Sequence, residues 1–506
     1  MTTTANFERV SPTLKSAPLV DTSNASPAIN GHEYGRWHAS GHPFLIRLTT
    51  AVALTAFAFL TPYTELVTEA LDGSRAAYGV ALPALMIVIA TGYRVPPRGV
   101  RDGESDWIVV TLAAATRFAA IHLLSERLPT LTDLWRLPLQ GIVLWFACAL
   151  AVLFGVRQVA RMWPLWVFAV CCATPLPYLL TVAMFGGSQT AAVLVAAGLG
   201  ALAVYLAGRL APLRSRLGAT LGCAAISTAF VFAGIPGNLL VSVVVVGAIV
   251  PIAACAALHL IARTGEDRPV RSYSRQSPVA LAILAAVSAA LFALNPPAPT
   301  APAAPVAHPG WTQRAALGAP EDYDFVDRYL GEGATLRRYP VAPVAGMPVA
   351  VVDVMSSPDL AALDDYAEAV WYPTNRPLDF RPADLSGLTD LDSYRASVIH
   401  TDASTAIDTE SRHWYAVTWV WHADDTFQRV TVVVNQDAAS NHQPPPPAPV
   451  TLMNSGVEPA LWIARQQAGT EGAVDPLVIR RATDVVRSLL ASAAEDNGDP
   501  QALTGA

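Results

Sequence analysis

The chain has 506 residues, of which 53% are hydrophobic and only 14% are charged. A soluble domain carries roughly 25% charged residues, so this composition indicates a membrane protein. Residues 1–299 hold 20 basic and 13 acidic residues, whereas residues 300–506 hold 13 basic and 27 acidic ones. The two halves therefore belong in different environments, and the acidity of the second half argues against nucleic-acid binding.

Nine windows are apolar and long enough to cross a bilayer as helices. They are 42–62, 77–94, 107–125, 137–156, 162–183, 189–211, 217–235, 237–262 and 277–296. The first 40 residues are polar and lack the apolar core of a cleavable signal peptide. We therefore expect a disordered cytoplasmic tail over 1–40 and a transmembrane helical domain over 41–296.

The basic residues predict the orientation of these spans. Every second connection is rich in arginine, and the basic residues of these connections are Arg36 and Arg47, then Arg94, Arg98 and Arg101, then Arg157 and Arg161, then Arg209, Arg214 and Arg216, then Arg263, Arg268, Arg271 and Arg275. The alternate connections are acidic, balanced or short, as in Phe-Gly-Gly-Ser and Ile-Pro-Gly-Asn. Because cytoplasmic loops collect arginine, the N terminus is predicted inside and the chain after nine crossings outside.

A Pro/Ala-rich linker over 297–310 is expected to form a stiff spacer that lifts the following domain off the membrane. Residues 311–495 are predicted to be an extracytoplasmic α+β domain, and 496–506 a disordered tail. The expected elements are strands over 347–355 and 393–401, helices over 359–372 and 475–496, and a hairpin over 413–436. Asp475 is a predicted N-cap, and Tyr415, Val417, Trp419 and Trp421 share one face of the first hairpin strand by period-two spacing.

The expected extracytoplasmic domain shows no pattern typical of a catalytic or metal centre. It contains no cysteine, and its histidines at 400, 413, 422 and 442 are scattered over predicted strands and loops. Its sequence has no nucleophile elbow, phosphate-binding loop or metal-ligand spacing. No metal and no cofactor are therefore predicted.

Arg117 lies near the centre of the third window, and His122 lies one turn further out. A charge at mid-bilayer is costly, so Arg117 should point into the bundle toward an internal partner. Two interpretations stay open, a site for an anion or carboxylate and an arginine that caps carbonyls of a broken neighbouring helix. The expected breaks are the prolines of 175–177 and the Pro236-Gly237 pair.

All five cysteines fall within the windows, at 148, 171, 172, 223 and 255. A cysteine nucleophile needs a thiolate, and a thiolate needs a basic neighbour and water. Neither Cys171 nor Cys172 has a base evident from sequence, so we favour small hydrophobic residues. Cys172 is nevertheless three residues before Pro175, so it remains a candidate nucleophile near the outer surface.

The stretch from Trp163-Pro164 to Pro175-Leu176-Pro177 resembles the exosortase/archaeosortase family. That resemblance implies a bacterial, multi-pass plasma-membrane enzyme that processes C-terminal sorting signals with a cysteine nucleophile. The chain lacks the family's Cys-Ser-Gly stretch, and Asn238 is not followed by the family's arginine. The paired prolines should end a helix at the interface, with Tyr178 at headgroup depth.

Three functional hypotheses follow from the sequence. We favour a non-catalytic integral membrane envelope protein whose external domain binds an envelope protein partner or a cell-wall component. The first alternative is an exosortase-like membrane thiol transpeptidase or protease. The second is a lipid-linked glycosyltransferase, which would use acidic residues such as Glu65, Glu69 and Asp72 in the first external connection.

Overall fold

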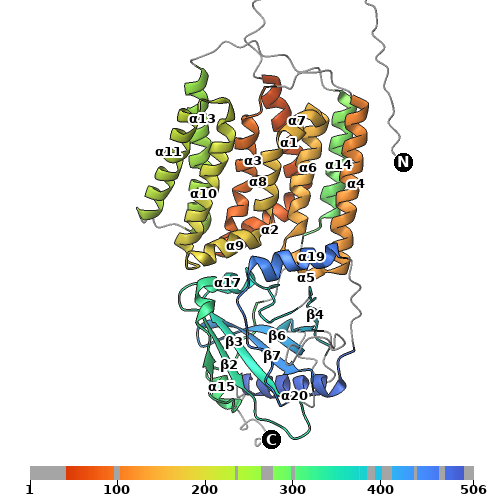
Figure 1. Cartoon of the computed structure of the whole chain (residues 1–506), viewed down its shortest axis with the longest axis vertical. Coiled ribbons are helices and arrows are strands. Elements are labelled where there is room, and N and C mark those ends of the chain that lie inside the picture. Colours follow the sequence, from red (N-terminus) through yellow and green to blue (C-terminus); the bar gives the residue numbers. More distant parts are fainter. Residues whose placement is uncertain are drawn as a thin grey trace, which may run out of the picture.

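The computed structural model describes residues 42–95, 103–233, 238–263, 277–297, 303–374, 376–384, 394–401, 413–437, 441–465 and 473–494. These residues form two layers stacked along the long axis of the molecule (Figure 1). We call residues 42–297 the helical bundle and residues 303–494 the sheet domain. The tails expected over 1–40 and 496–506 lie outside the described residues.

All nine apolar windows are helical where the structure describes them. The bundle helices are α1 (His42–Ala58), α2 (Leu60–Leu71), η2 (Arg75–Val80), α3 (Leu82–Thr91), α4 (Gly103–Arg127), α5 (Pro129–Leu134), α6 (Leu137–Phe154), α7 (Val156–Arg161), α8 (Trp163–Ala173), α9 (Pro175–Met184), α10 (Gln189–Ala207), α11 (Leu213–Phe232), α12 (Leu239–Val244), α13 (Val250–Arg263) and α14 (Pro278–Leu294). By length and composition, five described helices are able to cross a membrane, or seven if each of two bent pairs counts as one span. Two further windows form the shorter apolar helices Arg75–Thr91 and Pro278–Leu294.

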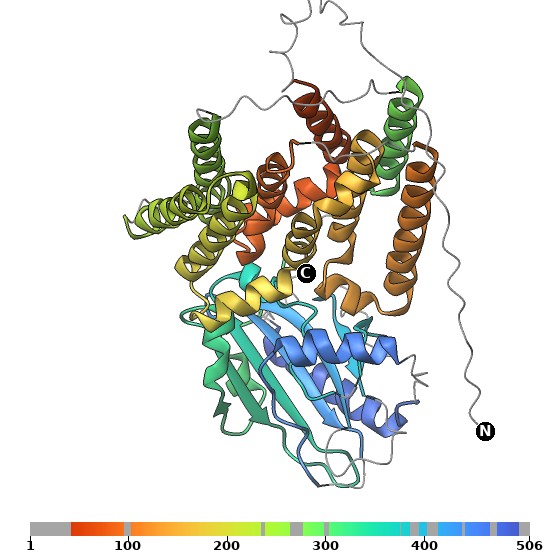
Figure 2. The ribbon, with the colours of Figure 1, turned by 45° about the horizontal axis from the view of Figure 1, so that its top comes forward.

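The two bent pairs turn sharply where the bundle meets the sheet domain. The α1–α2 pair bends by 76° and the α8–α9 pair by 71°. As predicted, the prolines end α8, because Pro175 has no N–H to donate and Thr174 before it is extended. The same prolines form the first turn of a new helix, α9. This helix lies along the sheet domain (Figure 2).

Tyr178 is buried in the interior of the protein, because α9 turns it toward η2 and α10. Its side chain is 5% exposed and stacks on Tyr78 with ring centroids 3.8 Å apart. Its hydroxyl donates a hydrogen bond to the carbonyl of Ala192 at 2.6 Å. Tyr178 therefore joins α9 to η2 and α10.

The described residues of three arginine-bearing connections adjoin α7 and the C-terminal ends of α3 and α10, at the end of the bundle away from the sheet domain (Figure 1). Arg161 at the end of α7 donates to the carbonyl of Val95 at 3.0 Å. Arg209 lies over the ring of Tyr93, with 4.3 Å between its guanidinium carbon and the ring centroid. Three connections that are distant in sequence thus contact one another at one end.

The sheet domain contains one antiparallel sheet of seven strands in the order β1-β2-β3-β7-β6-β5-β4. The strands are β1 (Glu321–Asp322), β2 (Thr335–Pro340), β3 (Ala350–Ser357), β4 (Arg381–Pro382), β5 (Ser397–His400), β6 (Trp414–Ala423) and β7 (Thr426–Asn435). The predicted hairpin is confirmed as β6–β7. Asp424 and Asp425 form its turn with positive φ values of 51° and 59°, as a type I′ turn requires.

The predicted closing helix is α20 (Pro476–Ala493), and it covers one face of the sheet. Asp475 caps it by accepting a hydrogen bond from the backbone N–H of Leu477 at 2.8 Å. The four side chains predicted to share a face of β6, Tyr415, Val417, Trp419 and Trp421, all belong to the core under α20. The opposite face of the sheet points toward the bundle (Figure 1).

The helix expected over 359–372 is much shorter, because α17 ends at Asp364. Arg429 on β7 donates to the carbonyls of Leu363 and Tyr366, both at 3.0 Å. Its buried guanidinium therefore caps the carbonyls at the end of α17. The remaining residues of the expected helix, 365–372, are not part of α17 and run between the sheet and the bundle.

The sheet domain packs directly on the bundle, so the linker does not act as the expected spacer. One apolar core includes Leu176 and Leu179 of α9 together with Tyr329, Leu363 and Tyr366 of the sheet domain. The hydroxyl of Tyr366 donates to the carbonyl of Leu179 at 3.3 Å. The described end of the linker instead pairs with the far end of β6, where the N–H of Ala307 donates to the carbonyl of His422 at 2.8 Å.

A polar contact between the layers centres on the carboxyl group of Asp365. It accepts hydrogen bonds from the Ser74 hydroxyl at 2.5 Å and from the Arg75 backbone N–H at 2.8 Å. The Arg75 guanidinium in turn donates to the carbonyl of Leu330 at 2.5 Å. Burial raises the pKa of Asp365 to about 6, although these hydrogen bonds and the nearby arginines oppose the rise.

Gly187 lets the backbones of the two layers approach closely. It lies between α9 and α10 with a φ of +63°, and a Cβ at this position would lie 2.1 Å from the carbonyl oxygen of Arg328. Such a distance is far shorter than any van der Waals contact, so a larger residue requires movement of α16 (Asp327–Leu330).

We predict that Gly187→Ala loosens the contact between the layers and lowers the stability of the protein by about 1–3 kcal/mol. Gly186→Ala is a matched control, because Gly186 also has a positive φ of +89° but has no neighbouring atom within 4 Å of the place that a Cβ would take. Thermal unfolding and hydrogen exchange over α16 measure the effect. Equal losses in the two variants would show that only backbone strain, and not the close approach, matters.

Candidate functional site

Arg117 has a partner other than the one expected. Its guanidinium donates to the side-chain oxygen of Gln140 on α6 at 2.7 Å, and the Gln140 amide donates to the Thr174 hydroxyl at 3.0 Å. Arg117 is thus linked to the α8–α9 break through the side chains of Gln140 and Thr174. Within the described residues it does not bind the backbone carbonyls that the break leaves without a helical partner. Arg117 is also exposed on α4 rather than enclosed by the bundle. Pro236 and Gly237 lie outside the described residues.

The carbonyls near the α8–α9 break are bound by Tyr78. Its hydroxyl lies 2.6 Å from the carbonyl oxygen of Cys172 and 3.3 Å from that of Thr174. A buried tyrosine hydroxyl therefore has the capping role that we expected of an arginine.

His122 and Arg117 do not form a common site. His122 lies 3.3 Å from the carboxylate of Glu126, one turn along α4, and both side chains are more than half exposed. This is the geometry of a surface i,i+4 pair.

The two adjacent cysteines differ in exposure. Cys171 is exposed on α8 and Cys172 is buried. Among the described residues neither thiol hydrogen-bonds to a basic side chain, and no three His, Cys, Asp or Glu side chains form a group able to hold a metal ion. A thiolate nucleophile needs a base within hydrogen-bonding reach, and within the described ranges neither thiol has one.

The other residues of the exosortase-like motifs lie at or near the starts of helices. Trp163 begins α8 and is 65% exposed, and Pro164 lies in the first turn of that helix. The carbonyl of Pro177 accepts a hydrogen bond from the hydroxyl of Thr181 at 2.7 Å. Asn238 caps α12 by accepting from the N–H of Leu240 at 3.1 Å.

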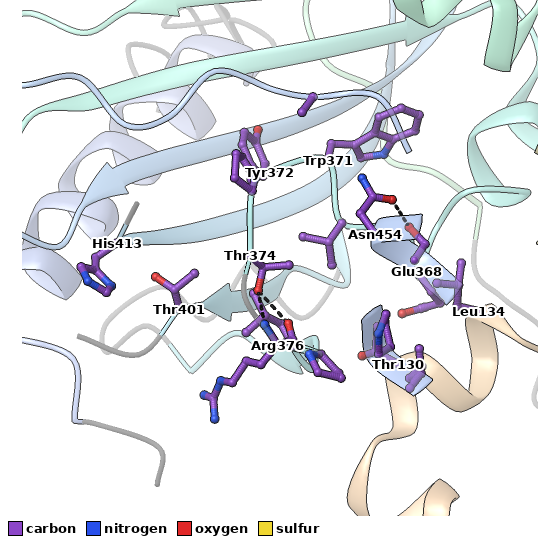
Figure 3. A pocket seen from close by; sticks show the side chains of 18 residues that line it. Thr130, Leu134, Glu368, Trp371, Tyr372, Thr374, Arg376, Thr401, His413 and Asn454 are labelled. Atoms are coloured by element: carbon purple, nitrogen blue, oxygen red, sulfur yellow. Dashed lines mark hydrogen bonds between the residues drawn. The ribbon is translucent and has the colours of Figure 1, made fainter. Parts of the chain in front are cut away.

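A cleft of about 300 Å³ lies between α5 and the sheet domain (Figure 3). Its residues come from α5, from the segment after α17, from the ends of β5 and β6 and from the turn before α19 (Glu458–Ala464). They are Thr130, Leu131, Leu134, Glu368, Val370, Trp371, Tyr372, Pro373, Thr374, Arg376, Pro377, Leu378, Thr401, His413, Ala448, Asn454, Ser455 and Pro459. We call this pocket the junction cleft.

Two hydrogen bonds fix the bundle to the sheet domain beside the junction cleft. The Phe380 backbone N–H donates to the Thr130 hydroxyl at 2.8 Å. The Trp135 indole N–H donates to the carbonyl of Ser455 at 2.9 Å. The cleft therefore depends on both layers.

A buried ion pair positions Tyr372 in the junction cleft. Arg338 on β2 and Asp353 on β3 face each other across the strands and form two hydrogen bonds of 2.7 Å. The Tyr372 hydroxyl donates to the Asp353 carboxylate at 2.6 Å, and Arg338 also donates to the carbonyls of Pro444 and Pro445. Burial, followed by the charge of Asp353, raises the pKa of Tyr372, so this hydroxyl stays a donor.

Two buried side-chain nitrogens that line the junction cleft have no hydrogen-bond partner among the described residues. They are the indole Nε1 of Trp371, which can only donate, and Nδ1 of the half-buried His413, which donates or accepts according to the tautomer. The backbone carbonyl of Trp371, by contrast, accepts a hydrogen bond from the N–H of Ala448 at 2.6 Å. A buried polar atom without a partner costs about 1–3 kcal/mol, so these two nitrogens favour a ligand that carries hydrogen-bonding groups, including an acceptor for the Trp371 indole N–H.

The junction cleft also contains an acidic group whose ionisation is disfavoured. Burial, followed by the negative charge of Asp133, raises the pKa of Glu368, and Arg429 opposes the rise. Below this raised pKa the Glu368 carboxyl is neutral and can donate a hydrogen bond.

Sequence reasoning missed the junction cleft because it assigned residues 359–372 to one helix. The useful signal was Trp371-Tyr372-Pro373 followed by Pro377, an aromatic and proline cluster typical of extended recognition segments. Glu368, Trp371 and Arg376 belong to this segment. Gln140 was missed because the sequence does not show which residue a single glutamine within a span will contact.

No family model, curated protein or solved structure matches the chain. The resemblance to the exosortase/archaeosortase family therefore stays a prediction from the quoted motifs.

The contact between Arg117 and Gln140 gives a prediction about coupling. We expect Arg117→Leu to lower protein abundance and thermal stability, because Gln140 then loses a donor, and Arg117→Lys to be partly tolerated. The double variant Arg117→Leu/Gln140→Leu should lose less than the sum of the single variants, with a coupling of about 0.5–1.5 kcal/mol. Strictly additive losses would show that this hydrogen bond does not contribute.

Proposed function

We propose that the chain is a non-catalytic, multi-pass protein of the bacterial plasma membrane that binds an extended segment of an envelope partner polypeptide in the junction cleft. The observation that carries this proposal is the pair of buried side-chain nitrogens, Nε1 of Trp371 and Nδ1 of His413, that line the cleft without a partner among the described residues. A backbone carbonyl of a bound segment would accept from the Trp371 indole N–H, and backbone N–H and C=O groups together would pair with either tautomer of His413.

An extended polypeptide is favoured because the sheet domain already holds one of its own beside the cleft. Residues 443–449 carry four consecutive prolines, and Arg338 donates to the carbonyls of Pro444 and Pro445 at 3.1 and 2.9 Å. The same segment donates from Ala448 to the carbonyl of Trp371. The residues around the cleft are thus suited to extended, proline-rich backbone.

The two catalytic alternatives have less support. A thiol transpeptidase needs a base beside Cys171 or Cys172, and the described residues provide no hydrogen-bonded one. For a lipid-linked glycosyltransferase, Glu69 is one of the acidic residues expected in the first external connection, but it already pairs with Arg136 at 2.5 Å.

The orientation in the membrane follows from the distribution of arginine. Arg161 and Arg209 contact residues just after α3, at the end of the bundle away from the sheet domain. With that end in the cytoplasm, the nine crossings expected from the sequence would put the N terminus inside and the sheet domain outside.

We predict that a reporter active only outside the cytoplasm is active when fused after Ala506. The same reporter fused after Arg94, in an arginine-rich connection, should be silent and serves as the control. A silent fusion after Ala506, with an active cytoplasmic reporter at the same place, would contradict the odd number of crossings.

We predict that a photo-crosslinking amino acid at Thr374 captures a polypeptide in the living host cell. Trp371→Phe keeps the aromatic ring but removes the indole N–H, so it should lower the adduct yield about tenfold. Trp163→Phe is a matched control, because Trp163 is exposed on α8 outside the junction cleft.

Protease treatment of the adduct distinguishes the partners. Loss of the mass shift after proteolysis identifies a polypeptide, whereas an adduct that resists protease and yields to glycan hydrolases identifies a cell-wall component instead. The second outcome, or an equal yield from Trp371→Phe, would contradict the proposed polypeptide ligand.

A further inference from the structure

A second cavity, of about 370 Å³, lies inside the helical bundle, within the range of about 300–1,000 Å³ typical of ligand sites. Its lining comes from α1, α2, η2, α3, α6 and α8 and is almost entirely apolar, with Val52, Phe59, Leu66, Leu82, Ile142 and Phe146 as representative residues. This intramembrane cavity shares no lining residue with the junction cleft.

The break between α1 and α2 shapes this cavity. The pair bends by 76° at Phe59, so α2 diverges from the axis of α1. Leu60 follows the break, lines the cavity and is 47% exposed, so the cavity reaches the bundle surface there. Exposed apolar surface at this depth meets lipid chains rather than water.

The interior of the cavity offers little to water or to a polar ligand. The hydroxyls of Thr55, Tyr63 and Tyr78 line it, and each already donates to a backbone carbonyl, at 2.8, 3.0 and 2.6 Å respectively. Apolar cavities of this kind take up hydrocarbon in preference to water. The interior therefore fits a lipid chain.

One charged side chain, that of Arg136, lines the cavity. It donates to the carboxylate of Glu69 on α2 at 2.5 Å, and the two side chains are 26% and 44% exposed. Arg136 has a φ of +46°, a backbone conformation uncommon for residues other than glycine. Trp135, next to Arg136, hydrogen-bonds to Ser455 of the sheet domain, so the pair lies at the end of the bundle nearest that domain, where lipid headgroups would be.

The charge around Arg136 does not favour a purely anionic ligand. Besides Glu69, the carboxylates of Asp133 and Asp365 interact electrostatically with Arg136. With Arg75 as the second cation near Asp365, the group holds three acids and two bases, so it carries no net positive charge. The exposed Arg136–Glu69 pair instead offers one positive and one negative group side by side.

We propose that the intramembrane cavity binds one acyl chain of a zwitterionic phospholipid, with the lipid phosphate at Arg136 and its ammonium group at Glu69. The apolar lining accepts the chain, the opening at Leu60 admits it from the bilayer, and the ion pair matches both charges of the headgroup. This lipid would fill the space that the α1–α2 break leaves between the helices.

The chain site is tested by obstructing the cavity. The full-length protein is purified in detergent, offered equal amounts of dioleoyl phosphatidylethanolamine and dioleoyl phosphatidylglycerol, and weighed intact by native mass spectrometry. Ala56 lines the exposed side of the cavity, so Ala56→Trp should obstruct the opening and lower retained phosphatidylethanolamine about tenfold. Ala53→Trp, on an exposed position of α1 outside the cavity, should retain it as the wild type does.

The headgroup site is tested by removing one charge at a time. Glu69→Gln and Arg136→Gln should each abolish the preference for phosphatidylethanolamine over phosphatidylglycerol, while Arg157→Gln at the other end of the bundle should keep it. These variants also test the proposal if Ala56→Trp fails to fold. Equal retention of the two lipids by the wild type, or equal retention of phosphatidylethanolamine by Ala56→Trp and Ala53→Trp, would overturn the proposal.

Discussion

The arrangement of the two layers depends on the carboxyl group of Asp365, which joins the sheet domain to the first connection of the bundle. Its partners are the hydroxyl of Ser74 and the backbone N–H of Arg75, and both come from a segment that the sequence marks only as a loop. Burial raises the pKa of Asp365 to about 6, above the ordinary 3.8, so its contribution to stability is largest in acid and declines as the pH rises through about 6. At neutral pH the hydrogen bonds and the nearby arginines offset part of the cost of burying the carboxylate.

Both candidate sites follow from the two helix breaks. The 71° break after Ala173 lays α9 against the sheet domain, and its apolar residues share a core with Tyr329 and Tyr366. The sheet domain is thereby held next to α5, and the junction cleft is the space left between them. The 76° break at Phe59 leaves the intramembrane cavity. A bundle of straight helices joined to the sheet domain by a spacer would have neither feature.

The sequence predicted what depends on local pattern. Apolar windows of span length became helices, the alternation of Tyr415 to Trp421 became a sheet face, and Asp475 became an N-cap. Features that depend on distant partners were not predictable. The end of α17 depends on Arg429, which lies more than 60 residues away, and the partner of Arg117 is a glutamine on another helix. Gly187 lies in a short connection without a motif, and its role is visible only once Arg328 lies against it.

The direct packing of the sheet domain on the bundle is the central claim, and the distance between two spin labels tests it most directly. One label at Arg157→Cys on α7 and one at Ser488→Cys on α20 report on the two ends of the molecule, in a background where the exposed Cys171 is replaced by alanine. Direct packing predicts one narrow distance distribution that Asp365→Ala broadens. A broad distribution in the otherwise unmodified protein, as a free spacer would give, would contradict it.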